Sequence, residues 1–455
     1  MHIHILGIGG TFMGGLALIA RSAGHKVTGC DMGVYPPMSE QLKEQGIEFT
    51  DGFQEDQINL NPDLYIVGNV VTRGNPLMEA ILEKGLPYTS GPQWLGDHIL
   101  REQYVLAVSG THGKTTSSSM LTHILQCAGL EPNFLIGGIA KDFNISARFT
   151  PDSKYFVIEA DEYDTAFFDK RSKFVHYHAN IAIINNIEYD HADIFPDLKA
   201  IENQFHNFVR ILPRNGTLIV PSKDETVARI LTRGLYCDKV EVGPDGAWSY
   251  SNVSDSTESF DILRNGEKIG SIKWKLTGIH NIKNALSCIA AADIIGIEPD
   301  KACEYLSKFS GIKRRMEVLG NPKNITIYDD FAHHPSAIAT TIDGLRKKVG
   351  DARIIAVLEP RSNTMKLGTM AKLLPQALIN ADEIYIYGEL NGKHALGWTP
   401  EEIFGPKTNV HIFHNIEELK SAILNVAVPN DHIVIMSNGS FQGLHRKLLS
   451  ELEKN

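Results

Sequence analysis

A lysine and two threonines follow a glycine-containing turn in the segment SGTHGKTT, Ser109–Thr116. The apolar run Tyr104–Val108 precedes this segment, and the helix-compatible stretch SSSMLTHILQCAG follows it. Between a strand and a helix, the backbone N–H groups of such a turn bind phosphate oxygens together with the helix N-terminus. Lys114 could then reach the outer phosphates, and the Thr115 hydroxyl could bind Mg²⁺. Although Val108 stands where the general pattern GxxxxGK[ST] has its first glycine, the segment predicts a nucleoside triphosphate site.

A second loop of small residues, GIGGTFMGGLA, follows the strand-like run HIHIL near the N-terminus. Small residues let a pyrophosphate approach a helix N-terminus closely, and Asp31 ends the next strand, where dinucleotide folds place a ribose-binding acid. Phe12, however, occupies the third glycine position of GxGxxG. The loop by itself is compatible with a pyrophosphate ligand such as NAD, or with a packed turn that binds nothing.

Acids and a histidine are expected at the ends of two central strands. KYFVIEADE ends in Glu159, Asp161 and Glu162, and IAIINNIEYDH ends in Asp190 and His191. The carboxyl ends of parallel strands line the ligand crevice of an open α/β sheet. Mg²⁺ prefers oxygen ligands, and a histidine nitrogen can join a less demanding site. Next to a phosphate-binding loop, metal binding is favoured for Glu159 and His191, whereas Asp161 and Glu162 could equally be solvated strand ends.

Bulk properties limit the class of protein. The chain has 455 residues, 43% hydrophobic and 22% charged, and a formal charge of −10. This size favours two or three domains, and the negative charge argues against a nucleic-acid partner. Five scattered cysteines without a CxxC pair suit free thiols in a reducing compartment. Because no signal peptide or bilayer-spanning apolar run is present, we expect a cytoplasmic protein with no membrane partner.

The order of strand-like and helix-like segments predicts three α/β domains. Short apolar strands alternate with helical patterns up to about residue 100, again from Tyr104, and again from about Gly320. The stretch from about Lys239 to Leu276 predicts antiparallel strands at the edge of the central sheet. We therefore expect domains at residues 1–100, 101–315 and 316–455.

The full set of motifs resembles one family. In order, GIGGTFMGG, SGTHGKTT, EADE, NIEYDH, GIHNIKNA, KRRME and DDFAHHP are similar to the Mur ligases, which are ATP-dependent amide-bond-forming enzymes. The resemblance runs along essentially the whole chain. It implies a Rossmann-like N-terminal domain, a central P-loop ATPase-like domain whose parallel sheet has antiparallel edge strands, and a Rossmann-like C-terminal domain.

The resemblance also implies a reaction. DDFAHHPSAI, LEPRSNTMKLG and IMSNGSFQGLH are most similar to members that join the tripeptide L-Ala-γ-D-Glu-meso-diaminopimelate to UDP-N-acetylmuramate in peptidoglycan recycling. The acid would be activated as an acyl phosphate at the expense of ATP, with Mg²⁺. The alternative within the family is the addition of L-alanine. Outside it, an NAD-dependent oxidoreductase leaves SGTHGKTT unexplained, and a nucleotide-dependent switch without ligase chemistry is a further alternative.

Site residues follow from the resemblance position by position. The diphosphate of the UDP-sugar would lie on the first loop and contact Gly7, Gly9, Gly10, Met13 and Gly14. Asp31 would lie toward the uridine. ATP would contact the second loop and residues that close on it from later segments: Gly110, Thr111, His112, Gly113, Lys114, Thr115, Thr116, His280, Asn281, Arg315 and Asp330.

The resemblance also implies the metal, peptide and catalytic residues. Thr115, Glu159 and His191 would hold Mg²⁺, and Arg361 and His334 would meet the incoming peptide. Lys114, His191 and His334 are the expected catalytic residues, although no single general base stands out.

Overall fold

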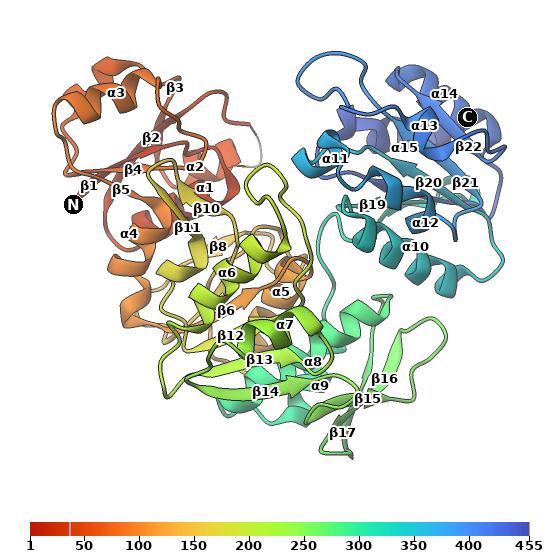
Figure 1. The fold of residues 1–455 in the computed structure, drawn as a ribbon, viewed down its shortest axis with the longest axis horizontal. Coiled ribbons are helices and arrows are strands. Elements are labelled where there is room, and N and C mark those ends of the chain that lie inside the picture. Colours follow the sequence, from red (N-terminus) through yellow and green to blue (C-terminus); the bar gives the residue numbers. More distant parts are fainter. Residues whose placement is uncertain (36–37, 455) are drawn as a thin grey trace.

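The computed structural model describes residues 1–35 and 38–454. Three α/β bodies follow one another along the chain, with the N-terminal body on the left and the C-terminal body on the right (Figure 1). Each body is built on a sheet that is wholly or mostly parallel, and helices cover its faces. The prediction of a three-domain α/β protein is confirmed.

The N-terminal sheet has five parallel strands in the order β3-β2-β1-β4-β5. Its strands are β1 (His2–Leu6), β2 (Lys26–Asp31), β3 (Glu48–Asp51), β4 (Leu64–Val67) and β5 (Tyr88–Ser90). Its helices are α1 (Thr11–Ser22), α2 (Met38–Glu44), η1 (Glu55–Leu60), α3 (Pro76–Glu83), α4 (Gly91–His98) and η2 (Leu100–Glu102). The order reverses beside β1, so the β1–α1 turn lies at the switch point where doubly wound sheets bind ligands.

Local sequence explains where these helices start. Asn75 caps α3, since its Oδ1 accepts the N–H of Met78 at 3.1 Å, and Pro76 follows at the first helical position. Ser90 caps α4 in the same way by accepting the N–H of Gln93. In contrast, α1 begins after Gly10 without a side-chain cap. Its first N–H groups therefore remain available to a ligand.

The central sheet has ten strands in the order β17-β16-β15-β14-β13-β12-β6-β9-β7-β8. They are β6 (Tyr104–Ser109), β7 (Asn133–Leu135), β8 (Ala147–Arg148), β9 (Tyr155–Glu159), β12 (Ile181–Ile184), β13 (Thr217–Pro221), β14 (Asp238–Val242), β15 (Trp248–Ser251), β16 (Ser259–Arg264) and β17 (Glu267–Lys273). A separate antiparallel hairpin consists of β10 (Asp164–Ala166) and β11 (Asp169–Ser172). The predicted antiparallel edge starts later than expected, because β14 pairs in parallel with β13 and antiparallel pairing begins between β15 and β16.

Helices cover both faces of the central sheet. One face packs against α6 (Leu198–Val209) and α7 (Glu225–Leu231), and the other against α5 (Lys114–Cys127), α8 (Ile279–Ile294) and α9 (Pro299–Leu306). The short η3 (Lys173–His176) follows the hairpin. The small residues of α8, such as Ala285 and Ala291, are fully buried and let α8 pack closely on α5.

The C-terminal sheet has the order β18-β19-β23-β20-β21-β22, with only β18 antiparallel. Its strands are β18 (Glu317–Gly320), β19 (Thr326–Asp330), β20 (Ile354–Leu358), β21 (Glu383–Tyr387), β22 (Val410–Phe413) and β23 (His432–Met436). Its helices are η4 (Pro322–Asn324), α10 (Pro335–Val349), α11 (Asn363–Leu367), η5 (Ala371–Leu373), α12 (Leu374–Ala377), α13 (Pro400–Phe404), α14 (Ile416–Val426), η6 (Phe441–Gly443) and α15 (Leu444–Lys454).

The first two domains share an apolar core, whereas the C-terminal domain has its own. One continuous cluster joins the N-terminal and central domains, because Leu135 and Ala147 of the central sheet lie against α1 at Gly15. The C-terminal domain has two clusters of its own, one on each face of its sheet. Its described contacts with the central domain include several hydrogen bonds, which lie around the candidate active site.

One expected strand is shorter than predicted. β12 ends at Ile184, so Asp190 and His191 lie in the loop that follows rather than at the strand end. The backbone of Asn185 still bonds to β6, since its N–H donates to the carbonyl oxygen of Ser109 at 3.0 Å. The side chains of the two asparagines bond to the phosphate-binding loop and to α5. The Oδ1 of Asn186 accepts the N–H of His112 at 2.9 Å, and the side-chain amide of Asn185 bonds to Ser117 at 3.0 Å.

Two bulk expectations can be compared with the structure. The five cysteines are free thiols, as predicted. Within residues 1–35 and 38–454, no helix combines the length and apolar character needed to cross a membrane.

Candidate active site

The central sheet brings the predicted phosphate-binding loop and acids to one edge. β6 lies between β12 and β9, and all three are parallel. Their carboxyl ends therefore place the loop after Ser109, the carboxylate of Glu159 and the segment after Ile184 side by side. This edge opens into a cavity of about 2560 Å³ that residues of all three domains line. The volume exceeds that of a pocket for one drug-sized ligand and can accommodate more than one substrate.

The loop between β6 and α5 has the backbone of a phosphate cradle. Gly110 and Gly113 have φ values of 128° and 82°, which side chains rarely adopt. A Cβ at Gly113 would also lie 2.8 Å from the Oδ1 of Asn284. No side chain caps α5, so its first N–H groups are free to bind an anion. Thr111 to Thr116 all line the cavity, and Gly110 shapes the loop behind them.

Lys114 is surrounded by carboxylates. Its Nζ donates to Glu162 Oε2 at 2.7 Å and to the carbonyl oxygen of Gly110 at 2.8 Å, and it lies 3.8 Å from Asp161. Burial by itself would lower the pKa of Lys114, but Glu162 and Asp161 outweigh burial and raise that pKa above its ordinary value. The side chain is therefore an ammonium at neutral pH, held where an outer phosphate would replace one carboxylate partner.

Glu159 lies at the end of β9, facing the same loop. Its Oε2 accepts the N–H of Gly137 at 2.8 Å, and the nearby Thr115 side chain helps to lower the pKa of its carboxyl. Burial raises the pKa of Glu159 even though Lys114 opposes the shift. A half-buried carboxylate near a hydroxyl offers oxygen donors that suit Mg²⁺, which also keeps phosphate oxygens and water as ligands.

His191 contacts Glu162 rather than Glu159. Its Nε2 donates to Glu162 Oε1 at 3.1 Å, so Glu162 bridges Lys114 and His191. Burial would lower the pKa of His191, but Glu162 reverses the shift and raises it. Each of Asp161, Glu162 and His191 offers one ligand atom, and these atoms lie within 4.8 Å of one another, a set that could hold a divalent cation.

The sequence left the role of Glu162 open, and the structure places its carboxylate between Lys114 and His191. It is 1% exposed. Asp161, beside it, accepts from Lys173 Nζ at 3.0 Å. Burial works to raise the pKa of Asp161, yet Lys173 and Lys114 hold it well below its usual value. The only signal in the sequence was the run of three acids in EADE.

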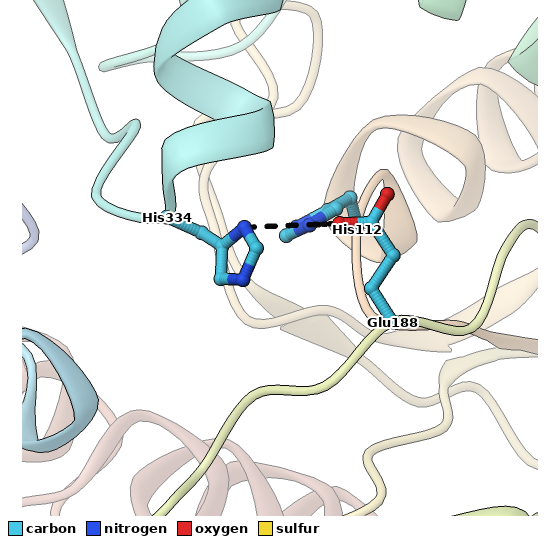
Figure 2. Close-up of side chains that lie close together, drawn as sticks. All are labelled: His112, Glu188 and His334. Carbon is cyan, nitrogen blue, oxygen red and sulfur yellow. Dashed lines mark hydrogen bonds and ion pairs between the residues drawn. The ribbon is translucent and has the colours of Figure 1, made fainter. Parts of the chain in front are cut away.

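A histidine pair and an acid join the central and C-terminal domains. Figure 2 shows His112 from the phosphate-binding loop, Glu188 from the segment after β12, and His334 from the start of α10. His112 Nε2 lies 3.4 Å from Glu188 Oε2, and His334 Nδ1 lies 3.8 Å from the same oxygen. The hydrogen bond from His112 is the main cause that lowers the pKa of Glu188 to about 2. Glu188 is therefore a carboxylate shared by two domains.

His334 is buried in this contact. It caps α10 by accepting the N–H of Ser336 through Nδ1, and its Nε2 donates to the carbonyl oxygen of Tyr189 at 3.1 Å. Burial lowers the pKa of His334, which is consistent with this neutral tautomer. The cavity wall includes His333 rather than His334. The contacts of His334 are those of a residue that joins two domains, and its role toward the peptide or in catalysis stays a prediction.

The residues predicted for the far side of ATP meet at the domain junction. His280, Asn281, Arg315 and Asp330 line the cavity together with the loop. Desolvation at this junction, followed by Arg315, lowers the pKa of His280 to about 4, although the residue keeps more than a third of its surface exposed. Asp330 accepts the N–H of Met316 at 2.7 Å and thereby fixes the backbone next to Arg315. The Arg315 guanidinium lies 5.0 Å from the centre of the Phe331 ring.

The residues predicted for the UDP-sugar lie around the start of α1. Gly9 lines the large cavity, and its N–H donates to Asp31 Oδ2 at 2.8 Å. The other oxygen of Asp31 accepts the N–H of Met32 at 2.7 Å. One carboxylate oxygen of Asp31 therefore supports the loop predicted to hold the diphosphate, and the other supports the turn that follows β2.

The remaining members of this set have backbone and packing positions. Gly7 has a φ of 86°, and Gly10 precedes the uncapped N-terminus of α1. Met13 and Gly14 are buried, with Met13 beside Gly91 of α4 and Gly14 beside Met38 of α2. Met13 and Gly14 thus set the position of the loop. The N–H groups of Gly9 and Gly10 bond within the protein, to Asp31 and to the carbonyl oxygen of Gly7, which leaves the uncapped start of α1 for a ligand.

Arg361 lies in the C-terminal domain, in the turn between β20 and α11. It lines the same cavity as Lys114, although the two residues belong to different domains. Its Nη2 lies 3.1 Å from His394 Nε2, and its Nη1 lies 3.5 Å from Glu359. The next turn of chain reaches the central domain, where Thr364 Oγ1 donates to Asp190 Oδ1 at 2.9 Å.

A glycine loop of the phosphate-binding kind, an uncapped turn before α1 and an arginine from the third domain lie around one cavity, the arrangement expected of a nucleotide-dependent ligase. Models of the Mur ligase family match nearly the whole chain: the family's catalytic domain at residues 2–103, the middle domain at 108–292 and the glutamate ligase domain at 314–439. The chain belongs to the Mur ligase family.

Three relatives indicate its place in the family. The chain is 50% identical over 455 residues to the UDP-N-acetylmuramate–L-alanyl-γ-D-glutamyl-meso-2,6-diaminoheptandioate ligase of Escherichia coli (strain K12), covering 100% of this chain and 99% of the relative. The crystal structure of a murein peptide ligase from Psychrobacter arcticus is 42% identical, with a TM-score of 0.76 over 100% of this chain and 99% of that one. A UDP-N-acetylmuramate–L-alanine ligase of Acetivibrio thermocellus is 34% identical over 369 residues, or 80% of this chain and 76% of the relative.

Proposed function

We propose that the chain joins the tripeptide L-Ala-γ-D-Glu-meso-diaminopimelate to UDP-N-acetylmuramate, with ATP hydrolysed to ADP and phosphate. The observation that carries the proposal is the single cavity that connects Gly9, Lys114 and Arg361, one residue from each domain. The 50% identity to a ligase of that name over the whole chain supports the same substrate pair. The L-alanine-adding relatives are more distant: one is 34% identical over 369 residues and another 30% identical over 451 residues.

Each domain would bind one substrate. Residues 1–100 bind the UDP-sugar at the β1–α1 turn, residues 101–315 bind ATP at the loop before Lys114, and residues 316–455 bind the peptide and close on the nucleotide. The support is the position of Gly9, Lys114 and Arg361 around the cavity. The separate apolar cores of the third domain suit an element that moves relative to the other two.

The chemistry starts from a carboxylate, which is a poor acceptor for an amine because it is anionic and has no leaving group. The N-acetylmuramate carboxylate attacks the γ-phosphorus, the bond to the ADP oxygen breaks, and an acyl phosphate forms. Two anions must meet in this step. The Lys114 ammonium and the N–H groups at the start of α5 stabilise the charge that accumulates.

Mg²⁺ fits the donor atoms that line this part of the cavity. Thr115, Glu159 and His191 would hold it, and Glu162 lies beside His191. When bound, Mg²⁺ neutralises charge on the phosphate oxygens. The Lys114 side chain would at the same time exchange its contact with Glu162 for a phosphate oxygen.

In the second step the amine of the peptide attacks the acyl carbon, phosphate leaves, and the amine loses a proton. Water would destroy the acyl phosphate, so the cavity has to close. The interdomain hydrogen bonds of Ser336 with Glu188 and of Thr364 with Asp190 hold the C-terminal domain over the loop. We assign no general base to this step.

The setting is the cytoplasm, where ATP and UDP-sugars are available, and the biological role is the recycling of cell-wall peptide. The five free thiols agree with a reducing compartment.

The test offers the purified chain ATP, Mg²⁺ and UDP-N-acetylmuramate with one amine at a time. We expect phosphate release and a UDP-linked product of the right mass with the tripeptide, and at least about 100-fold lower kcat/KM with L-alanine, since L-alanine lacks the groups that a peptide site would bind. Efficient turnover of L-alanine alone would assign the chain to the alternative. Phosphate release that needs neither amine nor UDP-sugar would indicate a nucleotide-dependent switch.

A further inference from the structure

Two groups of side chains in residues 1–35 and 38–454 place possible metal ligands close together. The first group lies beside Lys114 and offers two carboxylates and one imidazole. The second group offers two imidazoles and one carboxylate: His112, Glu188 and His334. Mg²⁺ prefers oxygen ligands, whereas Zn²⁺ binds well to two histidines, one glutamate and a water molecule. The second group therefore has the chemistry of a zinc site rather than of a magnesium site.

The spacing of the second group is close to that of a tetrahedral zinc site. His112 Nε2 lies 3.4 Å from Glu188 Oε2, and His334 Nδ1 lies 3.8 Å from the same oxygen. In a tetrahedral site with ligands about 2.0–2.1 Å from the ion, two ligand atoms are about 3.3–3.4 Å apart. The three ligand atoms lie within 4.8 Å of one another. Small rotations of the two imidazole rings would therefore complete the tetrahedron.

His334 is already oriented as a metal ligand. Its Nε2 donates to the carbonyl oxygen of Tyr189 at 3.1 Å, which leaves the lone pair on Nδ1. Zinc-binding histidines ordinarily donate their second ring N–H to a carbonyl or carboxylate oxygen in this way. Nδ1 accepts the N–H of Ser336 at 3.3 Å, a long hydrogen bond that a metal would replace. Figure 2 shows this nitrogen turned toward His112 and Glu188.

The large cavity gives an ion a route to this group. His112, Glu188 and Ser336 all line the cavity. The side chains of His112 and Glu188 are 24% and 41% exposed, while His334, at 4%, closes the inner side. A water molecule from the cavity can then supply the fourth ligand. The lowered pKa values of Glu188 and His334 keep both side chains in the deprotonated forms that bind a metal.

We propose that His112, Glu188 and His334 form a Zn²⁺ site, separate from the predicted Mg²⁺ site, and that the bound ion holds the C-terminal domain on the phosphate-binding loop. The three ligands come from the loop before α5, the segment after β12 and the start of α10. Metal–ligand bonds are stronger than the hydrogen bonds that now join these segments. Because an enzyme of this kind has to open to release its products, Zn²⁺ would inhibit turnover. The inhibition rests on the proposed function, whereas the binding site does not.

The experiment titrates the metal-free full chain with Co²⁺ in the presence of excess Mg²⁺. Tetrahedral Co²⁺ absorbs visible light more strongly than octahedral Co²⁺, so the spectrum reports the geometry of the site. Displacement of Co²⁺ by Zn²⁺ then gives the affinity for Zn²⁺. Three variants each change one ligand: His112→Gln, Glu188→Gln and His334→Asn. Asparagine at position 334 can still cap α10, so this variant separates metal binding from the start of the helix.

Two control variants remove other places where a metal could bind. His191→Gln removes the imidazole of the group beside Lys114. Cys127→Ser removes an exposed thiol whose Sγ lies 3.6 Å from His123 Nε2. The unfolding temperature of every variant is measured without metal to establish that it is folded, and again with Zn²⁺.

We expect the wild type to bind Co²⁺ with a tetrahedral spectrum and to exchange it for Zn²⁺. Each ligand variant should lose about 100-fold or more in Zn²⁺ affinity, since losing even a partner outside the ligand set costs about 10–100-fold. The two control variants should keep the wild-type spectrum and affinity. Zn²⁺ should raise the unfolding temperature of the wild type and the controls, but not that of the ligand variants.

Several outcomes would overturn the zinc site. A wild type without a saturable tetrahedral spectrum would contradict it, and so would a spectrum that persists in all three ligand variants. Loss of the spectrum in His191→Gln or Cys127→Ser alone would place the metal elsewhere.

Inhibition tests the effect of the bound ion. With excess Mg²⁺, Zn²⁺ should lower the kcat of tripeptide ligation by the wild type, and the ligand variants should lose a smaller fraction of their own rates. Zn²⁺ binding without any loss of kcat would overturn the proposed hold on the C-terminal domain. A wild type that makes no tripeptide product would overturn the proposed function, and the Co²⁺ spectra would still decide the zinc site.

Discussion

Ser336 Oγ of the C-terminal domain donates to Glu188 Oε2 of the central domain at 2.6 Å. The same carboxylate accepts from His112, which belongs to the phosphate-binding loop, and lies near His334 (Figure 2). One side chain thus contacts both the nucleotide loop and the domain that has to close over it. We infer that Glu188 couples nucleotide binding to domain closure.

Substituting Glu188 by alanine should weaken closure. The change removes the acceptor of Ser336 and His112, each worth roughly 1 kcal/mol, so we expect kcat/KM for the tripeptide to fall about tenfold or more. Small-angle scattering with an ATP analogue should show a less compact molecule than the wild type. Ser336→Ala, which breaks only the interdomain bond, should reproduce part of the effect. Unchanged compaction in both variants would exclude this role.

Lys114→Ala should abolish ligation. The ammonium is the nearest described cation to the loop's phosphate cradle, and losing such a group lowers turnover by about 10³-fold or more. The substitution also leaves Glu162, which is 1% exposed, without one of its two partners. A drop in thermal stability could then be mistaken for a loss of chemistry.

The double variant Lys114→Ala, Glu162→Gln serves as the control for that effect, since it removes the uncompensated buried charge. We expect it to unfold at nearly the wild-type temperature and to remain inactive. Turnover close to that of the wild type in either variant would contradict the assignment of Lys114.

Arg361→Ala should raise the tripeptide KM more than the ATP KM. Arg361 and Lys114 line the same cavity from different domains, so removing the guanidinium should leave nucleotide contacts unchanged. A charge-assisted bidentate contact is worth enough for an increase of about tenfold or more in the tripeptide KM. Steady-state kinetics with each substrate varied in turn measures both constants. Equal increases would remove Arg361 from peptide recognition.

His4 makes the stability of the N-terminal domain depend on pH. It lies on β1 with its Nδ1 2.8 Å from Thr28 Oγ1, and burial lowers its pKa from 6.5 to about 4. Above pH 6.5 the residue is neutral in both the folded and the unfolded chain. Between about 6.5 and 4 only the unfolded chain binds the proton, so acidification favours unfolding in that window.

The matched variant is His4→Gln, which cannot be protonated in this range. Between pH 7.5 and pH 5 we expect the unfolding temperature of the wild type to fall more than that of the variant. Calorimetry or circular dichroism at both pH values measures the difference. Parallel losses in the two proteins would show that other groups, such as His280 and His333, cause the acid sensitivity.

Local sequence was sufficient to predict those parts of the site whose residues are neighbours in the chain. The run Tyr104–Ser109 and the glycines at 110 and 113 determine a strand, a turn and an uncapped helix within a few residues. The alternation of apolar runs likewise predicts three parallel sheets, because each strand needs a crossover before it can pair with a parallel neighbour.

Contacts between distant segments were not predictable in the same way. Glu162 bonds to Lys114 and to His191, yet in the sequence it is one acid among three. The Glu188–Ser336 bond joins residues that are 148 positions apart. β12 was predicted too long. It ends at Ile184, and the side chains of Asn185 and Asn186 bond to segments much earlier in the chain, which the local pattern did not indicate.

Isotope transfer tests the central claim most directly. UDP-N-acetylmuramate with ¹⁸O in its carboxylate is incubated with the chain, ATP, Mg²⁺ and the tripeptide, and the released phosphate is analysed by mass spectrometry. If the carboxylate is phosphorylated at the loop before Lys114, one ¹⁸O atom appears in inorganic phosphate for each peptide bond formed. Unlabelled phosphate alongside tripeptide product would mean that the acid is never phosphorylated, and the account would be wrong.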